Sequence, residues 1–141
     1  MKRQPAIKLL FVIAALYDGI LGLLFLLAGT APFQWVNVTP PNHLGYVQFP
    51  AALLIIFALM FAAIARRPSR NRHLIPYGML LKVSYCAVVF GHWFSTGVPW
   101  IWKPFAILDL VFLVFFVWAY MALRESPGKE TGAQEEVQPV S

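Results

Sequence analysis

The chain has 141 residues, of which 60% are hydrophobic and only 12% are charged. Soluble domains usually carry about 25% charged residues, so this composition excludes an ordinary soluble domain and favours lipid as the solvent of a single domain. The net charge of +5 does not indicate nucleic-acid binding, because the Lys and Arg residues flank apolar stretches and form no basic stripe.

Four apolar stretches are long enough to cross a bilayer, whose hydrocarbon core of about 30 Å needs roughly 20 helical residues. The first stretch has the basic start of a signal peptide, but it is longer than a signal's apolar region and contains Asp18, which favours a retained helix. We predict an all-α integral membrane protein, a left-handed antiparallel four-helix bundle. Its helices are expected at about 7–28, 44–65, 74–94 and 100–123.

The basic residues predict the orientation of the chain. Nine of the 11 Lys and Arg residues lie near the N-terminus, between the second and third stretches, or after the fourth, whereas Lys103 lies at the opposite face. Because cytoplasmic segments carry the excess of Lys and Arg, both termini are predicted to be cytoplasmic. Residues 125–141 are rich in Glu, Gln, Gly and Pro and are expected to be a disordered cytoplasmic tail.

The segments at the opposite face are expected to be connections and an aromatic belt. Residues 30–43 form a polar, proline-containing stretch that we interpret as a loop. Trp35, Trp93, Trp100 and Trp102 gather at this boundary, where amphipathic rings commonly lie. We interpret these rings as a belt and not as binding residues.

Three ionisable residues fall inside the predicted spans: Asp18, Lys82 and Asp109. At a rise of about 1.5 Å per residue they lie roughly 16, 12 and 17 Å from the inner edge of the membrane, near its midplane. A charge exposed to lipid at that depth costs on the order of 3 kcal/mol. We therefore expect the three side chains to meet in the bundle interior, with a proton neutralising the carboxyl in excess of the lysine.

Such a cluster has two interpretations. Intramembrane ionisable residues are functional by default, which predicts a site for a proton, an ion or the cationic head of a small molecule. Buried ion pairs can instead fix helix register. Tyr85, three residues after Lys82, and His92, seven after Tyr85, lie on nearby faces of the same helix and complete the candidate binding cluster.

The sequence predicts no catalytic residue, metal site or cofactor. His43 and His92 both lie near the outer face and lack further ligands beside them, which makes a metal or haem site a poor interpretation. The single cysteine, Cys86, excludes a disulfide within the chain and a zinc site built on several cysteines.

Three runs of the sequence resemble those of small, uncharacterised four-helix bacterial membrane proteins, over roughly residues 9–123. The runs are Leu16-Tyr17-Asp18-Gly19, Gly45-Tyr46-Val47-Gln48-Phe49-Pro50 and Lys82-Val83-Ser84-Tyr85. The resemblance implies a four-helix membrane fold in a bacterial inner membrane and carries over no activity. Similarity to the DoxX-like and emopamil-binding-protein-like groups is one of architecture, which does not imply function.

Three hypotheses for the function follow. The leading one is a binding or accessory protein that holds a small amphipathic or lipid-like ligand, or a proton, at Asp18, Lys82 and Asp109. The second is a structural subunit that packs against another membrane protein. A third, weaker hypothesis is an intramembrane enzyme or redox subunit. The first expected partner is the lipid bilayer. The second is either a small amphipathic ligand or another membrane protein. The oligomeric state is left open.

Overall fold

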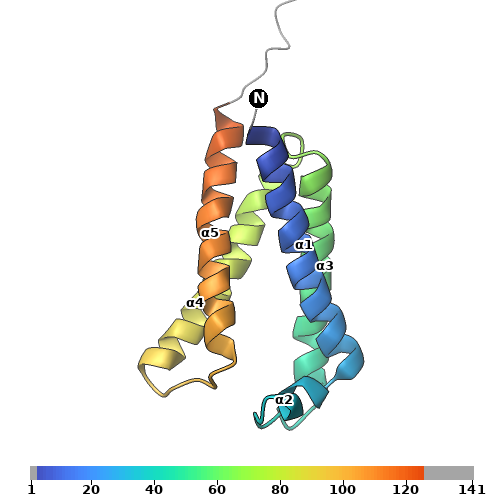
Figure 1. Ribbon diagram of the computed structural model, residues 1–141, viewed down its shortest axis with the longest axis vertical. Helices are drawn as coiled ribbons and strands as arrows, with labels where there is room; N and C mark the ends of the chain where they lie inside the picture. Colours follow the sequence, from blue (N-terminus) through green and yellow to red (C-terminus); the bar gives the residue numbers. More distant parts are fainter. Residues whose placement is uncertain (1–2, 126–141) are drawn as a thin grey trace, which may run out of the picture.

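The computed structural model describes residues 3–125, so the predicted tail lies outside the described residues apart from Glu125. Within this range the chain contains helices and no strands. The helices are α1 (Arg3–Ala28), α2 (Ala31–Trp35), α3 (Gly45–Arg66), α4 (Ile75–Phe94) and α5 (Trp102–Arg124), with a 3-10 turn, η1 (Arg72–Leu74), before α4 (Figure 1). Four of them, counting η1 with α4, are long and apolar enough to cross a membrane, which confirms the prediction of four apolar helices.

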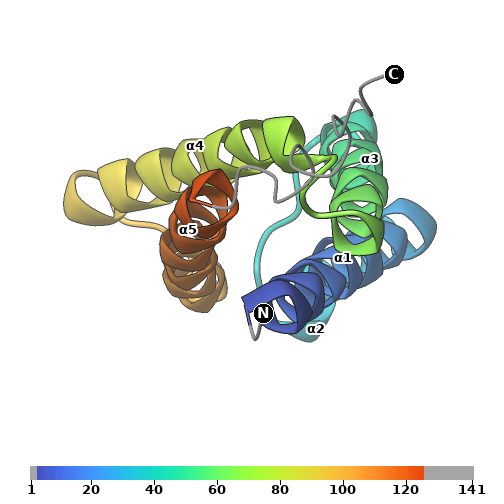
Figure 2. The ribbon, with the colours of Figure 1, turned by 90° about the horizontal axis from the view of Figure 1, so that it is seen from above.

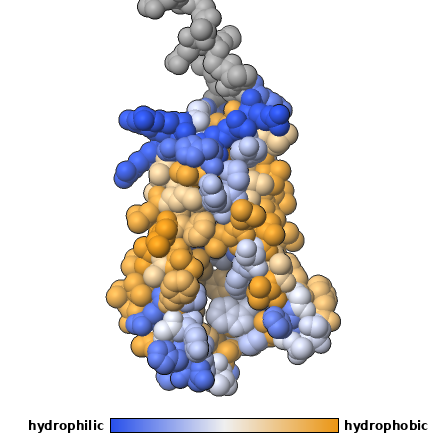
Figure 3. All heavy atoms as spheres, turned by 180° about the vertical axis from the view of Figure 1, so that it is seen from behind, coloured by the Kyte–Doolittle hydropathy of each residue, from blue (hydrophilic) through white to orange (hydrophobic). Residues whose placement is uncertain are grey.

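The outward faces of the long helices carry large apolar side chains. Leu9, Leu27, Leu59, Leu80 and Val114 are all at least 60% exposed. A space-filling view shows an apolar band along the helices, with hydrophilic residues gathered at both ends (Figure 3). So large an apolar surface is unfavourable in water and suits the hydrocarbon region of a bilayer, where the backbone polar groups are satisfied within each helix. The protein is therefore a multi-pass membrane protein by the character of its surface.

The segment between α1 and α3 differs from the predicted loop because it contains α2. Phe33 of α2 is buried, with its ring 5.6 Å from that of Phe25 and 5.8 Å from that of Trp102. Both contacts are edge-on, which is a favourable geometry for aromatic rings. Burial of Phe33 against α1 and α5 therefore gives this short helix its place in the fold.

The four long helices form two pairs and not one evenly packed bundle. Helix α1 packs along α3, and α4 packs along α5. The pairs meet at the end that bears the N-terminus and the last turn of α5, and they diverge toward the opposite end (Figure 1). Viewed along the long axis, α4 begins beside the end of α3 and then leads away from it (Figure 2).

The hydrophobic core lies at the end where the pairs meet. Several of its members are alanines, whose small side chains let helices approach closely. The ring of Phe116 lies 4.9 Å from that of Phe11 and 5.2 Å from that of Phe61, which fills the centre. The buried residues of this core are Ile7, Phe11, Ala14, Phe61, Ile64, Ala65, Ile75, Phe116, Ala119, Ala122 and Leu123.

The connection from α3 to α4 holds the pairs together at the same end. The side-chain amide of Asn71 donates a 2.7 Å hydrogen bond to the carbonyl of Ala63 in the last turn of α3. The guanidinium of Arg72 lies 4.4 Å from the centre of the Tyr120 ring on α5, a cation–π contact. These two contacts fix the start of α4 against both neighbours.

Within the first pair, α1 and α3 are in close contact at Gly22. A Cβ built at Gly22 would lie 2.8 Å from the carbonyl oxygen of Ala51 and 2.8 Å from Cγ1 of Ile55. Because one of these neighbours is backbone, the helices would have to move apart to accept a side chain. A Cβ at Gly91, on an exposed part of α4, would meet nothing within 4 Å.

We expect Gly22→Ala to lower the free energy of unfolding by about 1–3 kcal/mol, the usual cost of overpacking. Gly91→Ala is the matched control, and it should be neutral or stabilising by up to about 1 kcal/mol because alanine favours a helix. Unfolding in mixed micelles, followed by circular dichroism, measures both. Equal effects of the two substitutions would show that the α1–α3 contact at Gly22 is not tight.

Candidate functional site

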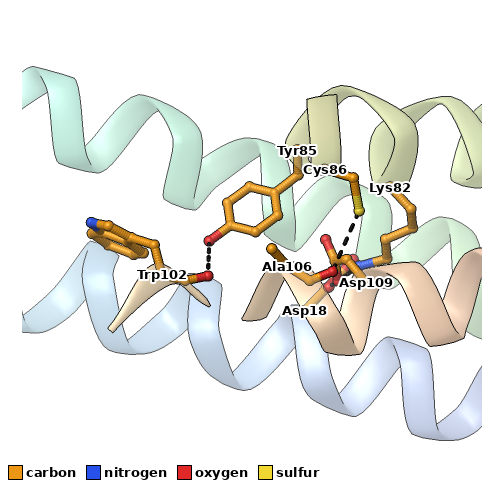
Figure 4. Close-up of polar contacts among 7 residues, drawn as sticks. All are labelled: Asp18, Lys82, Tyr85, Cys86, Trp102, Ala106 and Asp109. Carbon is orange, nitrogen blue, oxygen red and sulfur yellow. Dashed lines mark hydrogen bonds and ion pairs between the residues drawn. The ribbon is translucent and has the colours of Figure 1, made fainter. Parts of the chain in front are cut away.

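Asp18, Lys82 and Asp109 meet in the interior, as expected from the cost of burying charge. They come from α1, α4 and α5, and all three side chains are almost fully buried. The ammonium of Lys82 donates a 2.8 Å hydrogen bond to Oδ1 of Asp18 and forms an ion pair at 3.0 Å with Oδ1 of Asp109 (Figure 4). The cluster therefore links the two helix pairs through one lysine.

Two carboxylate oxygens of the cluster lack a hydrogen-bond donor among the described residues. They are Oδ2 of Asp18 and Oδ1 of Asp109, the latter being close to the ammonium of Lys82 but outside hydrogen-bond alignment. Leaving a buried acceptor unsatisfied is costly, and the great majority of buried polar groups have a partner. The cluster thus has acceptor capacity beyond what its own lysine fills.

Aromatic rings surround the ammonium of Lys82. Its nitrogen lies 5.2 Å from the ring centre of Tyr17, 5.4 Å from that of Phe112 and 5.9 Å from that of Phe61. The negative faces of aromatic rings attract a cation at these distances. The rings and the two carboxylates together surround this nitrogen with groups that attract a cation.

Two neighbours of Lys82 on the same face of α4 contact the backbone of α5. The Tyr85 hydroxyl lies 3.5 Å from the carbonyl oxygen of Trp102, and the Cys86 sulfur lies 3.5 Å from that of Ala106 (Figure 4). Spacings of three and four residues place Tyr85 and Cys86 beside Lys82 on the helix. These contacts fix the rotation of α4 about its own axis. They thereby orient the Lys82 side chain toward the two carboxylates.

A cavity of about 620 Å³ lies between the helix pairs, in the half of the molecule where they diverge. Its volume is within the range of about 300–1,000 Å³ typical of small-molecule sites. Asp18 and Asp109 are in its wall, whereas Lys82 lies behind them and does not line it. Most of the wall is apolar and much of it aromatic, including Tyr17, Phe25, Phe33, Tyr46, Tyr85, Trp102 and Phe105.

The cavity is closed on one side and open on another. On the α1–α5 side the Tyr17 ring lies 5.3 Å from that of Phe112 and 6.3 Å from that of Phe105, and Phe25 lies 6.4 Å from Trp102. On the other side, where α4 is in view, the surface is hollowed between the two pairs (Figure 3). An apolar molecule in the bilayer can therefore approach the cavity from the side of α3 and α4.

The structure brings four of the five predicted site residues together and leaves the fifth apart. Tyr85 lines the cavity beside the ion cluster. His92 is exposed and its ring nitrogen pairs with the Thr96 hydroxyl at 3.1 Å, so it does not lie with the cluster. The seven-residue spacing does place Tyr85 and His92 on one face, but α4 has diverged from α1 and α3 by that point.

Trp102 corrects the interpretation of the outer tryptophans as a belt. It is half-buried and lines the cavity, in contact with the rings of Phe25, Phe33 and Phe105. Trp35 and Trp100, by contrast, are exposed. The signal in the sequence was the spacing from Trp102 to Asp109, seven residues or two helical turns, which places both on one face of α5.

Among residues 3–125, no group of three or more His, Cys, Asp and Glu side chains is arranged to hold a metal ion. No family model, curated protein or solved structure matches the chain.

We expect Lys82→Met to lower the free energy of unfolding by about 3–5 kcal/mol, because it leaves two buried carboxylates without their shared cation. The triple variant Asp18→Asn, Lys82→Met, Asp109→Asn should regain most of this loss, since no charge is then left uncompensated. Detergent unfolding curves for both variants measure the difference.

The control for this prediction is Arg3→Met, which breaks the ion pair of Arg3 with Glu125 at 3.1 Å. Both side chains of that pair are about two-thirds exposed, so its loss should cost at most about 1 kcal/mol. A Lys82→Met protein as stable as Arg3→Met would show that the buried cluster does not hold the helix pairs together.

Proposed function

We propose that the protein is a membrane-embedded binding protein that holds a small amphipathic molecule in the cavity between its helix pairs. The observation that carries this proposal is the position of Asp18 and Asp109 in the wall of a 620 Å³ apolar cavity. Binding sites for small molecules combine a mostly apolar wall with a few polar groups that fix orientation. An ion cluster that served only helix register would have no need of such a space beside it.

The shape of the site supports a ligand that reaches it from the bilayer. The cavity opens to the surface on the side of α4, where the hollow is bordered by apolar residues and by residues of intermediate hydropathy (Figure 3). The wall also includes Leu54 of α3 and Leu81 of α4. A molecule with an apolar tail and a small polar head would place the tail among these side chains and the head at the carboxylates.

The topology that goes with this function has both termini in the cytoplasm. Arg66, Arg67 and Arg70 lie at the end where the helix pairs meet, the same end as the N-terminus (Figure 1). At the other end Lys103 lies against Trp93, with its ammonium 4.7 Å from the ring centre. The excess of positive residues supports a cytoplasmic location for the end with the termini, and hence a cavity in the opposite leaflet.

To test the orientation, we expect Asn42→Cys to react with a membrane-impermeant maleimide in intact cells, while Ser69→Cys reacts only after the cells are opened. Both positions are exposed and lie in connections at opposite ends of the long helices. The native Cys86 is buried and gives the background labelling. The reverse pattern would place the termini outside the cytoplasm.

To test binding, we expect dodecanol to form a one-to-one adduct with the protein in native mass spectrometry from nanodiscs of zwitterionic lipid. Leu54→Trp, which fills the cavity, should weaken this adduct at least about tenfold, since an overfilled site must lose its occupant or its packing. Leu59→Trp is the matched control because Leu59 is 67% exposed on the same helix and does not line the cavity.

An adduct that persists in Leu54→Trp as it does in Leu59→Trp would overturn the proposed site, and so would the absence of any adduct in the unaltered protein. In either case a structural subunit becomes the better hypothesis. It predicts that a specific membrane protein is recovered by mild cross-linking.

A further inference from the structure

The charges that face the cavity are of one sign. Asp18 and Asp109 are in its wall, and the ammonium of Lys82 lies behind them, 2.8 and 3.0 Å from one oxygen of each carboxylate. No other Asp, Glu, Lys or Arg among the described residues lines the cavity. With all three groups ionised the cluster carries one negative charge more than its lysine balances.

Two carboxylate oxygens of the cluster also lack a hydrogen-bond donor among the described residues. Oδ2 of Asp18 has no hydrogen-bond partner among the described residues, and Asp18 is only 1% exposed. A buried carboxylate oxygen without a donor is costly, and a charged donor gives the stronger hydrogen bond. A ligand that brings one positively charged donor would correct both the charge and the missing hydrogen bond.

The wall beside the carboxylates is suited to the same kind of group. Tyr17, Tyr85 and Phe105 line the cavity near Asp18 and Asp109 and present aromatic rings. Aromatic faces attract ammonium groups, most strongly where water is excluded. A carboxylate or phosphate head would meet the excess negative charge of the cluster at the same place, so the site discriminates against anions.

We propose that the ligand head is a cation, namely the ammonium of an amine that carries an apolar tail. The ammonium lies against Asp18 and Asp109, and the tail extends through the aromatic part of the cavity toward the side of α3 and α4. This inference rests on the proposed function and adds to it the charge of the ligand. A neutral head, such as an alcohol, satisfies the hydrogen bond but leaves the charge of the cluster to be balanced by a proton.

The test compares three probes with one tail: dodecylamine, dodecanol and dodecanoate, each added to the protein in nanodiscs of zwitterionic lipid. We expect the amine to bind about tenfold to a hundredfold more tightly than the alcohol, the range for a hydrogen bond to a charged group. Dodecanoate should bind most weakly. Native mass spectrometry reports the occupancy of each probe.

The decisive variant is Asp18→Asn, which leaves Lys82 and Asp109 as a balanced pair. It should bring the affinities for dodecylamine and dodecanol to within about threefold of each other, because the cluster then carries no excess negative charge. Glu125→Gln is the matched control, because it removes an exposed carboxylate at the other end of the helices. Where Asp18→Asn does not fold, the variant with all three cluster residues neutralised takes its place, with the same expected loss of preference.

The outcomes separate this inference from the proposed function. Equal binding of amine and alcohol, with Leu54→Trp still blocking both, would overturn the cationic head and leave the binding site in place. An amine preference that survives in Asp18→Asn, or that disappears in Glu125→Gln, would likewise overturn it. Failure of all three probes to bind the unaltered protein would overturn both proposals.

Discussion

The ion cluster of Asp18, Lys82 and Asp109 is the constraint on which the rest of the structure depends. It lies at the boundary between two regions of different packing, the closely packed core and the open cavity. Lys82 belongs to one helix pair and Asp18 to the other, so their contact crosses the line along which the molecule opens. Separating the pairs further would expose these charges to lipid, which sets a limit on how far the cavity can widen.

The packing on either side of the cluster follows from side-chain size. Toward the termini, small residues such as Ala14 and Ala119 allow the helices to approach, and stacked phenylalanines fill the space that remains. Beyond the cluster the facing residues include large rings, among them Phe25 and Trp102. Rings of this size on facing helices line the space between the diverging pairs.

The sequence predicted that the three charged residues would meet, because exposing any of them to lipid would be costly. Three ionisable groups near one depth must meet in the interior, whatever the details of packing. His92 was placed wrongly by the same kind of reasoning, because spacing along a helix gives the face of a residue but not the distance to the next helix. The α2 segment and the role of Trp102 depend on contacts between residues far apart in the chain, which periodicity does not report. The cavity itself arises from the tilt of α4, and no local pattern encodes it.

The composition of the cluster is compatible with a structural role and with the proposed binding role together. A closed salt bridge between one acid and one base would satisfy register and leave nothing for a ligand. A second acid is unnecessary for register, yet Asp109 shares the lysine with Asp18 and faces the same cavity. Because one lysine cannot fully satisfy two carboxylates, the fold keeps a buried site with unused acceptors next to an apolar space. The excess carboxylate, and not the salt bridge, is therefore the part of the cluster that stability alone does not account for.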